Sequence, residues 1–169
     1  MIIKSQDITG KLTHWIAKKF TDLALLGKFE LHDNFNKPKG MWLSWNNGWE
    51  DWCNSEQPNW INKEKFDCLN AKLKYNLKLW LIDNMNDFLD LWGKYCDIYK
   101  IEKNDEYVVY NNQEQIKTFW QYLVEEGFDG IALSEQGQNE TRMRTWLYGW
   151  DCCSIIVFNP ENVLLSRGK

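Results

Sequence analysis

Apolar and polar positions form their sharpest boundary near residue 154. The apolar, largely β-branched run 155–158 is closed by Asn159 and Pro160, which indicates a core strand that ends in a turn. The stretch immediately before it, residues 146–154, carries an acid, a glycine and several aromatic rings. Polar chemistry therefore meets a buried strand here, and the sequence predicts a functional site at this boundary.

Helical spacing of apolar residues predicts four further elements. The spacing favours a helix over residues 10–27, with Gly27 at the C′ position, and one or two helical turns over 49–53. Asn84 is a plausible N-cap for a helix with an apolar face, from which Asp87 and Asp90 are expected to point away. Another helix is predicted from Asn112, as its cap, to Gly127.

Strands are predicted where apolar residues alternate or cluster in short runs. These are residues 2–3, 41–45, 72–83 and 128–133, and the boundary stretch around 146–158 supplies the last strand or hairpin. Residues 33–40 and 134–141 are expected to be polar loops. Within the ambiguous stretch 99–110, residues 102–105 resemble a turn and residues 107–110 fit either a strand or a buried connector.

Mixed elements without strict strand–helix alternation favour an α+β fold over a doubly wound one. The 169 residues are about one domain's worth and contain no internal repeat. We therefore expect a single domain over residues 1–169.

Composition adds three constraints. Eleven tryptophans exceed what packing usually recruits, and we expect roughly two-thirds of them in the core and the rest on a binding surface. A net charge of −4 gives no global field for nucleic acid. Five cysteines without metal-ligand spacing, no signal-peptide pattern and no apolar run of membrane-spanning length predict a cytoplasmic protein without structural zinc and without a membrane anchor.

Standard catalytic motifs are absent from the sequence. It has no P-loop, no nucleophile elbow and no His-Glu-x-x-His. His14 lies in a mainly apolar segment, where a structural histidine is the commoner reading, and packing is the expected role of Cys152 and Cys153.

Three blocks nevertheless stand in a suggestive order. They are residues 37–44 (KPKGMWLS) followed by 49–53 (WEDWC), then 127–131 (GFDGI), then 146–160 (WLYGWDCCS and the apolar run). The order and content resemble an ADP-ribosyltransferase-like group of viral and microbial proteins. That group has Lys-Pro-x-Gly-Leu-Trp-x-Ser, Trp-x-x-Trp-Cys, Tyr-Asp-Gly-Ile and Trp-Tyr-Tyr-Gly-Trp-Asp-Cys motifs, and the resemblance touches about two-thirds of the chain.

The resemblance implies a split, mainly antiparallel β-sandwich with flanking helices around a cleft that holds NAD as substrate, without a metal. By motif, Trp42 and Ser44 line the second strand, Tyr148 and Trp150 form an aromatic wall, and Asp151 is the catalytic carboxylate. Cleavage of the bond between nicotinamide and ribose develops positive charge on the sugar, so a carboxylate beside it stabilises the transition state.

The sequence departs from this group at two places. Related proteins begin with His-Tyr-Ser, whereas here the first predicted strand offers Lys4 and Ser5, with His14 further on, so all three are candidates for anchoring the nucleotide. Ser154 stands where polymerase-like members have a glutamate, which leaves the catalytic role to Asp151 or implies lost activity. Arg142 and Arg144 are candidates for binding a pyrophosphate or a phosphate of the target, with a solvated loop as the alternative.

Three functions remain open from the sequence. The first is a NAD-dependent ADP-ribosyltransferase that modifies a protein or a nucleic acid, as a toxin or host-interference factor. The second is a non-catalytic module that binds NAD, ADP-ribose or a peptide on the same fold. The third is a structural interaction protein whose Trp49, Trp52 and Trp60 anchor an interface.

Overall fold

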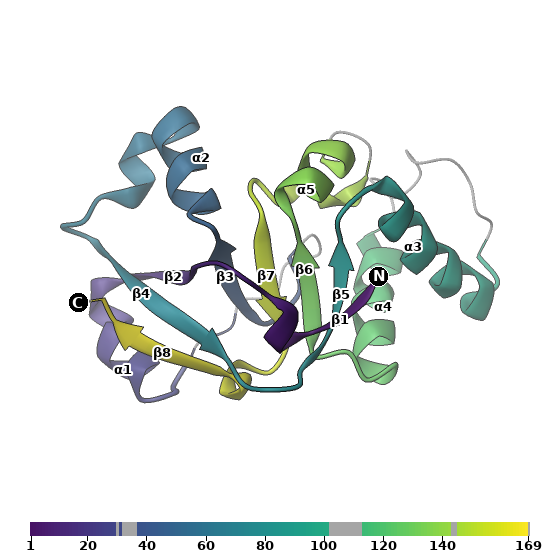
Figure 1. The fold of residues 1–169 in the computed structure, drawn as a ribbon, viewed down its shortest axis with the longest axis horizontal. Helices are drawn as coiled ribbons and strands as arrows, with labels where there is room; N and C mark the ends of the chain where they lie inside the picture. The colour runs from purple at the N-terminus through teal and green to yellow at the C-terminus, as the bar shows by residue number, and fades with distance from the viewer. Residues whose placement is uncertain (30, 32–36, 102–112, 143–144, 169) are drawn as a thin grey trace.

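The chain forms one mixed, eight-stranded β-sheet in the computed structural model, which describes residues 1–29, 31, 37–101, 113–142 and 145–168 (Figure 1). The strand order is β1-β5-β6-β7-β3-β2-β4-β8, and only β5 and β6 run parallel among the pairs described. The bounds are β1 Ile2–Lys4, β2 Leu12–Ala17, β3 Met41–Trp45, β4 Phe66–Leu73, β5 Lys78–Ile82, β6 Gly130–Leu133, β7 Ser154–Val157 and β8 Val163–Arg167.

Helices occupy both ends of this sheet. The α-helices are α1 Thr21–Leu25, α2 Gly48–Glu56, α3 Met85–Tyr99, α4 Gln113–Glu125 and α5 Glu135–Thr141. Short 3₁₀ turns are η1 Ser5–Asp7, η2 Lys18–Phe20, η3 Pro58–Ile61, η5 Trp146–Gly149 and η6 Pro160–Asn162. In Figure 1, α3 and α4 cover β5 and β6, whereas α2 stands over the other end of the sheet. The α+β prediction is confirmed at this level.

Two apolar clusters lie on opposite faces of the central strands. The first packs α3 and α4 onto β5, β6 and β7, and includes Trp92, Phe119 and Ile156. The second joins alternate residues of β3, β6 and β7 to side chains from β4 and β8, such as Val163 and Leu165. Since strands from both ends of the sheet contribute to this second cluster, the sheet curls around it (Figure 1).

The predicted helix over residues 10–27 is wrong for most of its length. Residues 12–17 form β2, which pairs with both β3 and β4, and only the short α1 follows. Leu12 and Ile16 have helical spacing, but Thr13 and Trp15 between them face the opposite side of the sheet and are also shielded. A strand covered on both faces loses its two-residue period, which explains the error. Gly27 does adopt a positive φ of 74° after α1.

The predicted strand over 72–83 is really two strands with a turn. β4 ends at Leu73, Asn76 has a positive φ of 68°, and β5 begins at Lys78. Tyr75 in this turn is 80% exposed, so its place in the alternation is coincidental. Residues 134–141 form α5, capped by the Ser134 hydroxyl, where a loop was expected. The strand β8 was missed.

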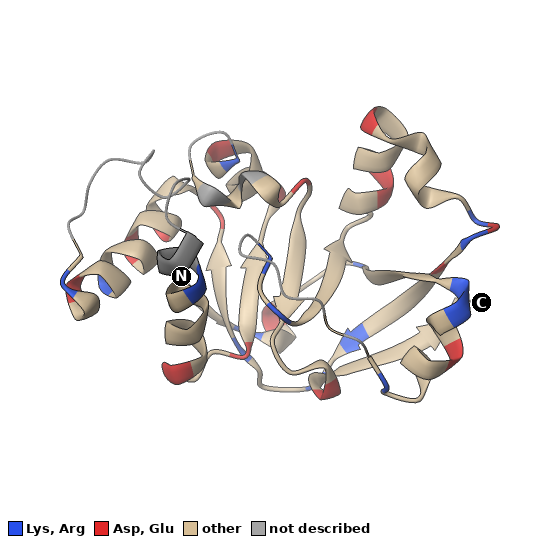
Figure 2. Ribbon diagram, turned by 180° about the vertical axis from the view of Figure 1, so that it is seen from behind, with Lys and Arg blue, Asp and Glu red and all other residues tan. Residues whose placement is uncertain are grey.

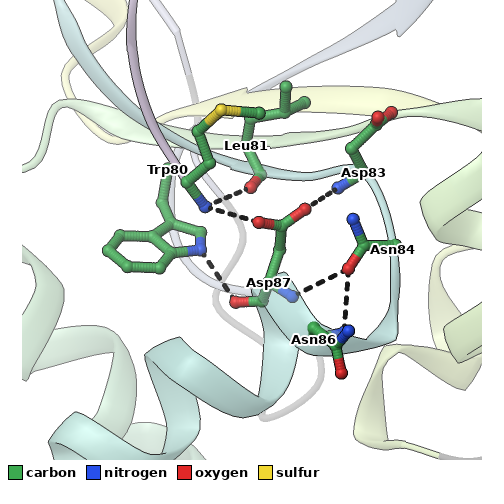
Figure 3. A network of polar contacts seen from close by, with 7 residues as sticks. Trp80, Leu81, Asp83, Asn84, Asn86 and Asp87 are labelled. Carbon is green, nitrogen blue, oxygen red and sulfur yellow. Dashed lines mark hydrogen bonds and ion pairs between the residues drawn. The ribbon is translucent and has the colours of Figure 1, made fainter.

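The Asn84 cap of α3 is confirmed, but Asp87 does not point away. The Asn84 side chain accepts hydrogen bonds from the backbone N–H groups of Asn86 and Asp87 (Figure 3). The Asp87 carboxylate accepts a hydrogen bond from the Asp83 N–H and pairs with the Met1 ammonium at 3.1 Å. Asp87 therefore ties α3 to β1 and β5, whereas Asp90 is exposed as expected. Asn112 and residues 102–110 lie outside the described residues.

Among the described tryptophans, fewer are buried than the expected two-thirds. Trp80, Trp92, Trp120 and Trp150 are buried, whereas Trp15, Trp42, Trp45, Trp49 and Trp52 are partly exposed and Trp60 is 50% exposed. Most of the partly exposed rings belong to β2, β3 and α2, which contribute residues to the pocket described below. In the part of the chain described, no helix is long and apolar enough to cross a membrane.

Candidate functional site

The pocket lies where β2 separates from β3. It has a volume of about 670 Å³, in the range typical of small-molecule sites. Its walls come from β2, β3, the η3–β4 segment and the residues just before β7, which are distant in sequence. The lining residues are His14, Trp15, Lys37, Trp42, Leu43, Ser44, Trp49, Asn59, Trp60, Lys65, Phe66, Trp150, Asp151, Cys152 and Ser154.

The separation of the two strands is visible in their register. Leu12 pairs with Trp45 and Thr13 with Ser44, after which β2 continues along β4 alone. The His14 ring fills the gap, with Nδ1 2.8 Å from the carbonyl oxygen of Trp42. Because a carbonyl only accepts, Nδ1 carries the hydrogen and donates it. A side chain thus replaces a ladder hydrogen bond where the sheet opens.

His14 is held in its neutral form. Burial lowers its pKa from the ordinary 6.5, and this outweighs the opposing effect of the hydrogen bond to Trp42. With Nδ1 donating to the carbonyl, Nε2 is the acceptor nitrogen of the neutral ring. The residue can therefore accept a hydrogen bond from a ligand hydroxyl, and a positive charge on the ring is disfavoured.

Two tryptophans form one wall. The rings of Trp42 and Trp150 meet edge to face with centroids 4.5 Å apart, and Trp150 stacks at 6.1 Å on Trp120 of α4. Trp150 is only 1% exposed, so packing against the helices fixes its position. The aromatic wall is therefore continuous with the first apolar cluster, which gives the pocket a rigid side.

Asp151 lies at the mouth of the pocket between two cations. Its carboxylate oxygens are 3.7 Å from Lys37 Nζ and 3.9 Å from an Arg142 guanidinium nitrogen. These are long pairs, and the Asp151 side chain is 24% exposed, so they contribute little to stability. A ligand phosphate can compete for both cations and leave the carboxylate facing the pocket.

The two serines of the site already have structural partners. Ser44 Oγ accepts a hydrogen bond of 2.9 Å from the Trp49 N–H in the first turn of α2. Ser154 Oγ donates to the carbonyl of Cys152 at 3.1 Å and pairs in register with Ser44. Ser44 therefore positions α2 over the pocket, and neither hydroxyl is next to a base that would activate it as a nucleophile.

The nearby thiols are poor nucleophiles. Burial raises the pKa of Cys152 to about 12, with smaller contributions from Cys153 and Asp151. Burial also raises the pKa of Cys53 and of Cys153, with the charges of Asp151 and Glu135 adding to the respective effects. Thiolates are the reactive form, so packing remains the role of these cysteines.

Not every predicted site residue reaches the pocket. Ser5 donates to the Lys74 carbonyl at 2.7 Å and accepts from the Leu77 N–H at 3.0 Å, so it fastens η1 to the β4–β5 turn. Neither Ser5 nor its neighbour Lys4 lines the pocket, and His14 is the one candidate anchor that does. The side chain of Tyr148 and all of Arg144 lie outside the described residues.

Sequence reasoning missed one wall entirely. Trp15, Asn59, Lys65 and Phe66 line the pocket together with Trp60. Trp15 follows the candidate anchor His14 directly, and this adjacency was a signal that the sequence offered. Asn59 and Lys65 carry no motif, and their positions follow only from the way η3 folds back on α2.

Comparisons add no family to this geometry. The chain matches no family model, no curated protein and no solved structure. Among the residues that the structure describes, no three His, Cys, Asp or Glu side chains are grouped so that they could hold a metal ion. The site must therefore be interpreted from its own residues.

Proposed function

We propose that this protein is a NAD-dependent ADP-ribosyltransferase built on a split β-sandwich. The supporting observation is the convergence of His14, Trp42 and Asp151, three residues from distant parts of the sequence, on the pocket where β2 and β3 part. An anchor, an aromatic wall and a carboxylate are the groups that transfer of ADP-ribose requires. The resemblance of the three sequence blocks to ADP-ribosyltransferases independently favours the same chemistry.

Each residue has a definite task in this proposal. The acceptor nitrogen of neutral His14 takes a hydrogen bond from a ribose hydroxyl, and Trp42 and Trp150 pack against the nicotinamide ribose and exclude water. Lys37 and Arg142 bind the pyrophosphate, which releases Asp151 from its two ion pairs. The Asp151 carboxylate then lies beside the ribose.

The reaction breaks one bond to ribose C1′ and forms another. The bond between the nicotinamide nitrogen and ribose C1′ breaks, and its electron pair leaves with neutral nicotinamide. The acceptor's nucleophile forms a new bond to C1′ and loses its proton. The ribose is most positive between these events, and the negative charge of Asp151 is worth most at that moment.

The substitution Asp151→Asn tests the assignment. We expect it to lower the rate of nicotinamide release from labelled NAD by about 10²- to 10³-fold, the range found when one electrostatic stabiliser is removed. Asp90→Asn on the exposed face of α3 removes the same charge and should leave the rate unchanged. Absence of nicotinamide release and of transfer to cell-extract acceptors by the parent protein would refute the enzymatic function.

A non-catalytic module on the same fold is the second candidate. It is favoured by Ser154, which stands where polymerase-like enzymes have a glutamate and whose hydroxyl is already bonded to Cys152. Calorimetric titration separates the two functions. Tight binding of ADP-ribose without nicotinamide release, equal in the parent and in Asp151→Asn, supports the module.

A further inference from the structure

The pocket has a second aromatic wall that the proposed chemistry leaves unused. Trp49 stacks on Trp52 with centroids 5.2 Å apart, and Trp60 lies 6.0 Å and 5.7 Å from these two rings. Trp60 is 50% exposed although two other indoles hold it. An exposed ring that its neighbours immobilise is a ready platform for stacking, because little side-chain entropy is lost on binding.

Polar groups border this platform on one side. Asn59 and Lys65 line the same pocket wall as Trp60. The turn that carries Lys65 is fixed by Asn62, whose carbonyl accepts from the N–H groups of Lys65 and Phe66 and whose side chain accepts from the Glu64 N–H. The Lys18 N–H donates to the Lys65 carbonyl at 3.0 Å, which places η2 beside this turn.

Four exposed lysines lie at this turn and at the adjacent η2. Lys18, Lys19, Lys63 and Lys65 are exposed, and within the described part of the chain none of them forms an ion pair with an acid. Glu64 is the one acid within residues 57–66, and Glu56 and Asp67 flank this stretch. In Figure 2, basic positions flank one acidic position at the turn that precedes β4, and further basic positions lie at η2, close to the C-terminus. A local cationic surface thus exists on a protein whose net charge is −4.

We propose that this wall binds single-stranded nucleic acid, with one base stacked on Trp60 and the neighbouring phosphates on Lys63, Lys65 and Lys18. Sequence-tolerant binding of single strands combines aromatic platforms with cationic tracks, and here the lysines of the turn before β4 and of η2 lie next to the platform. Asn59 is placed to hydrogen-bond the edge of the stacked base. If the proposed transferase activity holds, this strand is the acceptor, because its base enters the pocket that contains Asp151.

Binding is measured without NAD, so that it does not depend on the transferase activity. Fluorescence anisotropy of a labelled 12-nucleotide single strand, as DNA and as RNA, gives the affinity at several salt concentrations. Trp60→Ala should weaken binding about 5- to 150-fold, and Trp60→Phe, which keeps a stacking ring, should retain most of it. Replacing Lys63 and Lys65 together by glutamine should lower the slope of log affinity against log salt by about 1.4.

The matched control neutralises two exposed lysines at the end of β4 that is farther along the chain from Lys63 and Lys65. Lys72→Gln with Lys74→Gln removes the same charge and should leave both affinity and salt slope at the parent values. A 12-mer with an abasic site in place of each base keeps the phosphates and should bind about as weakly to the parent as the normal strand binds to Trp60→Ala.

Three outcomes would overturn the proposal. They are no binding of either strand by the parent, equal binding of the abasic strand, and an effect of Lys72→Gln/Lys74→Gln as large as that of the Lys63 and Lys65 pair. Failure of the transferase proposal appears differently. Asp151→Asn would then match the parent in the nicotinamide assay, while oligonucleotide binding and its loss in Trp60→Ala would persist.

Discussion

The two ends of the sheet use the same residue type in opposite ways. Between α3, α4 and the sheet, Trp92 and Trp120 are buried against Phe119 and other rings. Around α2, the rings of Trp49 and Trp60 contact each other with centroids 6.0 Å apart but still border a pocket. Aromatic clustering alone therefore does not identify a core. The number of layers that cover the cluster decides between packing and binding.

The difference follows from what stands above each end. Two amphipathic helices, of 15 and 13 residues, cover β5 and β6, whereas one nine-residue helix and a 3₁₀ turn stand over the other end. α2 has too small an apolar face to fill the space that opens when β2 leaves β3. The pocket is the space that remains.

The largest contrast should appear on truncating one ring at each end. Phe119→Ala, at a fully buried position on α4, should lower the free energy of unfolding by about 3–5 kcal/mol. Trp60→Ala removes a larger ring but one that is 50% exposed, and should cost about 1 kcal/mol or less. Urea unfolding measures both. Equal losses would mean that the α2 cluster is a second core and not an open wall.

A smaller effect should follow from crowding the contact between α2 and the residue just before β7. A Cβ at Gly48 would lie 2.5 Å from Cys153 Sγ and 3.0 Å from the Cys153 carbonyl oxygen, so Gly48→Ala should cost about 1–3 kcal/mol in urea unfolding. When Cys153→Ala has removed the sulfur, Gly48→Ala should cost less than it costs in the parent protein. Strictly additive costs would place the strain elsewhere.

The smallest expected effect is a pH dependence of stability caused by His14, which lies where β2 separates from β3. Because burial lowers the pKa of His14, the folded protein binds fewer protons than the unfolded chain between that lowered pKa and about 6.5. The contribution of neutral His14 to the free energy of unfolding is therefore fully present above about pH 6.5, and it is lost as the pH falls through this window. His14→Gln should reduce that acid slope by up to about 1.4 kcal/mol per pH unit. Parallel stability profiles of parent and variant from pH 5 to 8 would contradict it.

Local rules predicted the elements whose structure is locally determined. Residues 41–45 form the expected strand, Asn84 caps α3, and Gly127, with a φ of 71°, follows α4. Although the strand at 41–45 also depends on its pairing with β2 and β7, the deciding interaction for the cap and for the glycine lies within a few residues of the signal. The same holds for the helical turns after Asn47, which became α2.

Elements that depend on distant partners were not predictable in this way. β2 is a strand because β3 and β4 flank it, and this pairing overrides the helical spacing of Leu12 and Ile16. The site shows the same division. Trp42, Ser44, Trp150, Asp151 and Ser154 were found from motifs, whereas Asn59 and Lys65 reach the pocket only through the way η3 folds back on α2.

The strand order also sets how the chain can fold. β3 pairs with β7 and β4 with β8, so the pocket end of the sheet joins segments roughly a hundred residues apart, and contacts this distant slow folding because a long loop must close first. Until β7 and β8 arrive, the edges of β3 and β4 expose unpaired backbone groups. We therefore expect the pocket end to form late and to be the region through which partly folded chains aggregate.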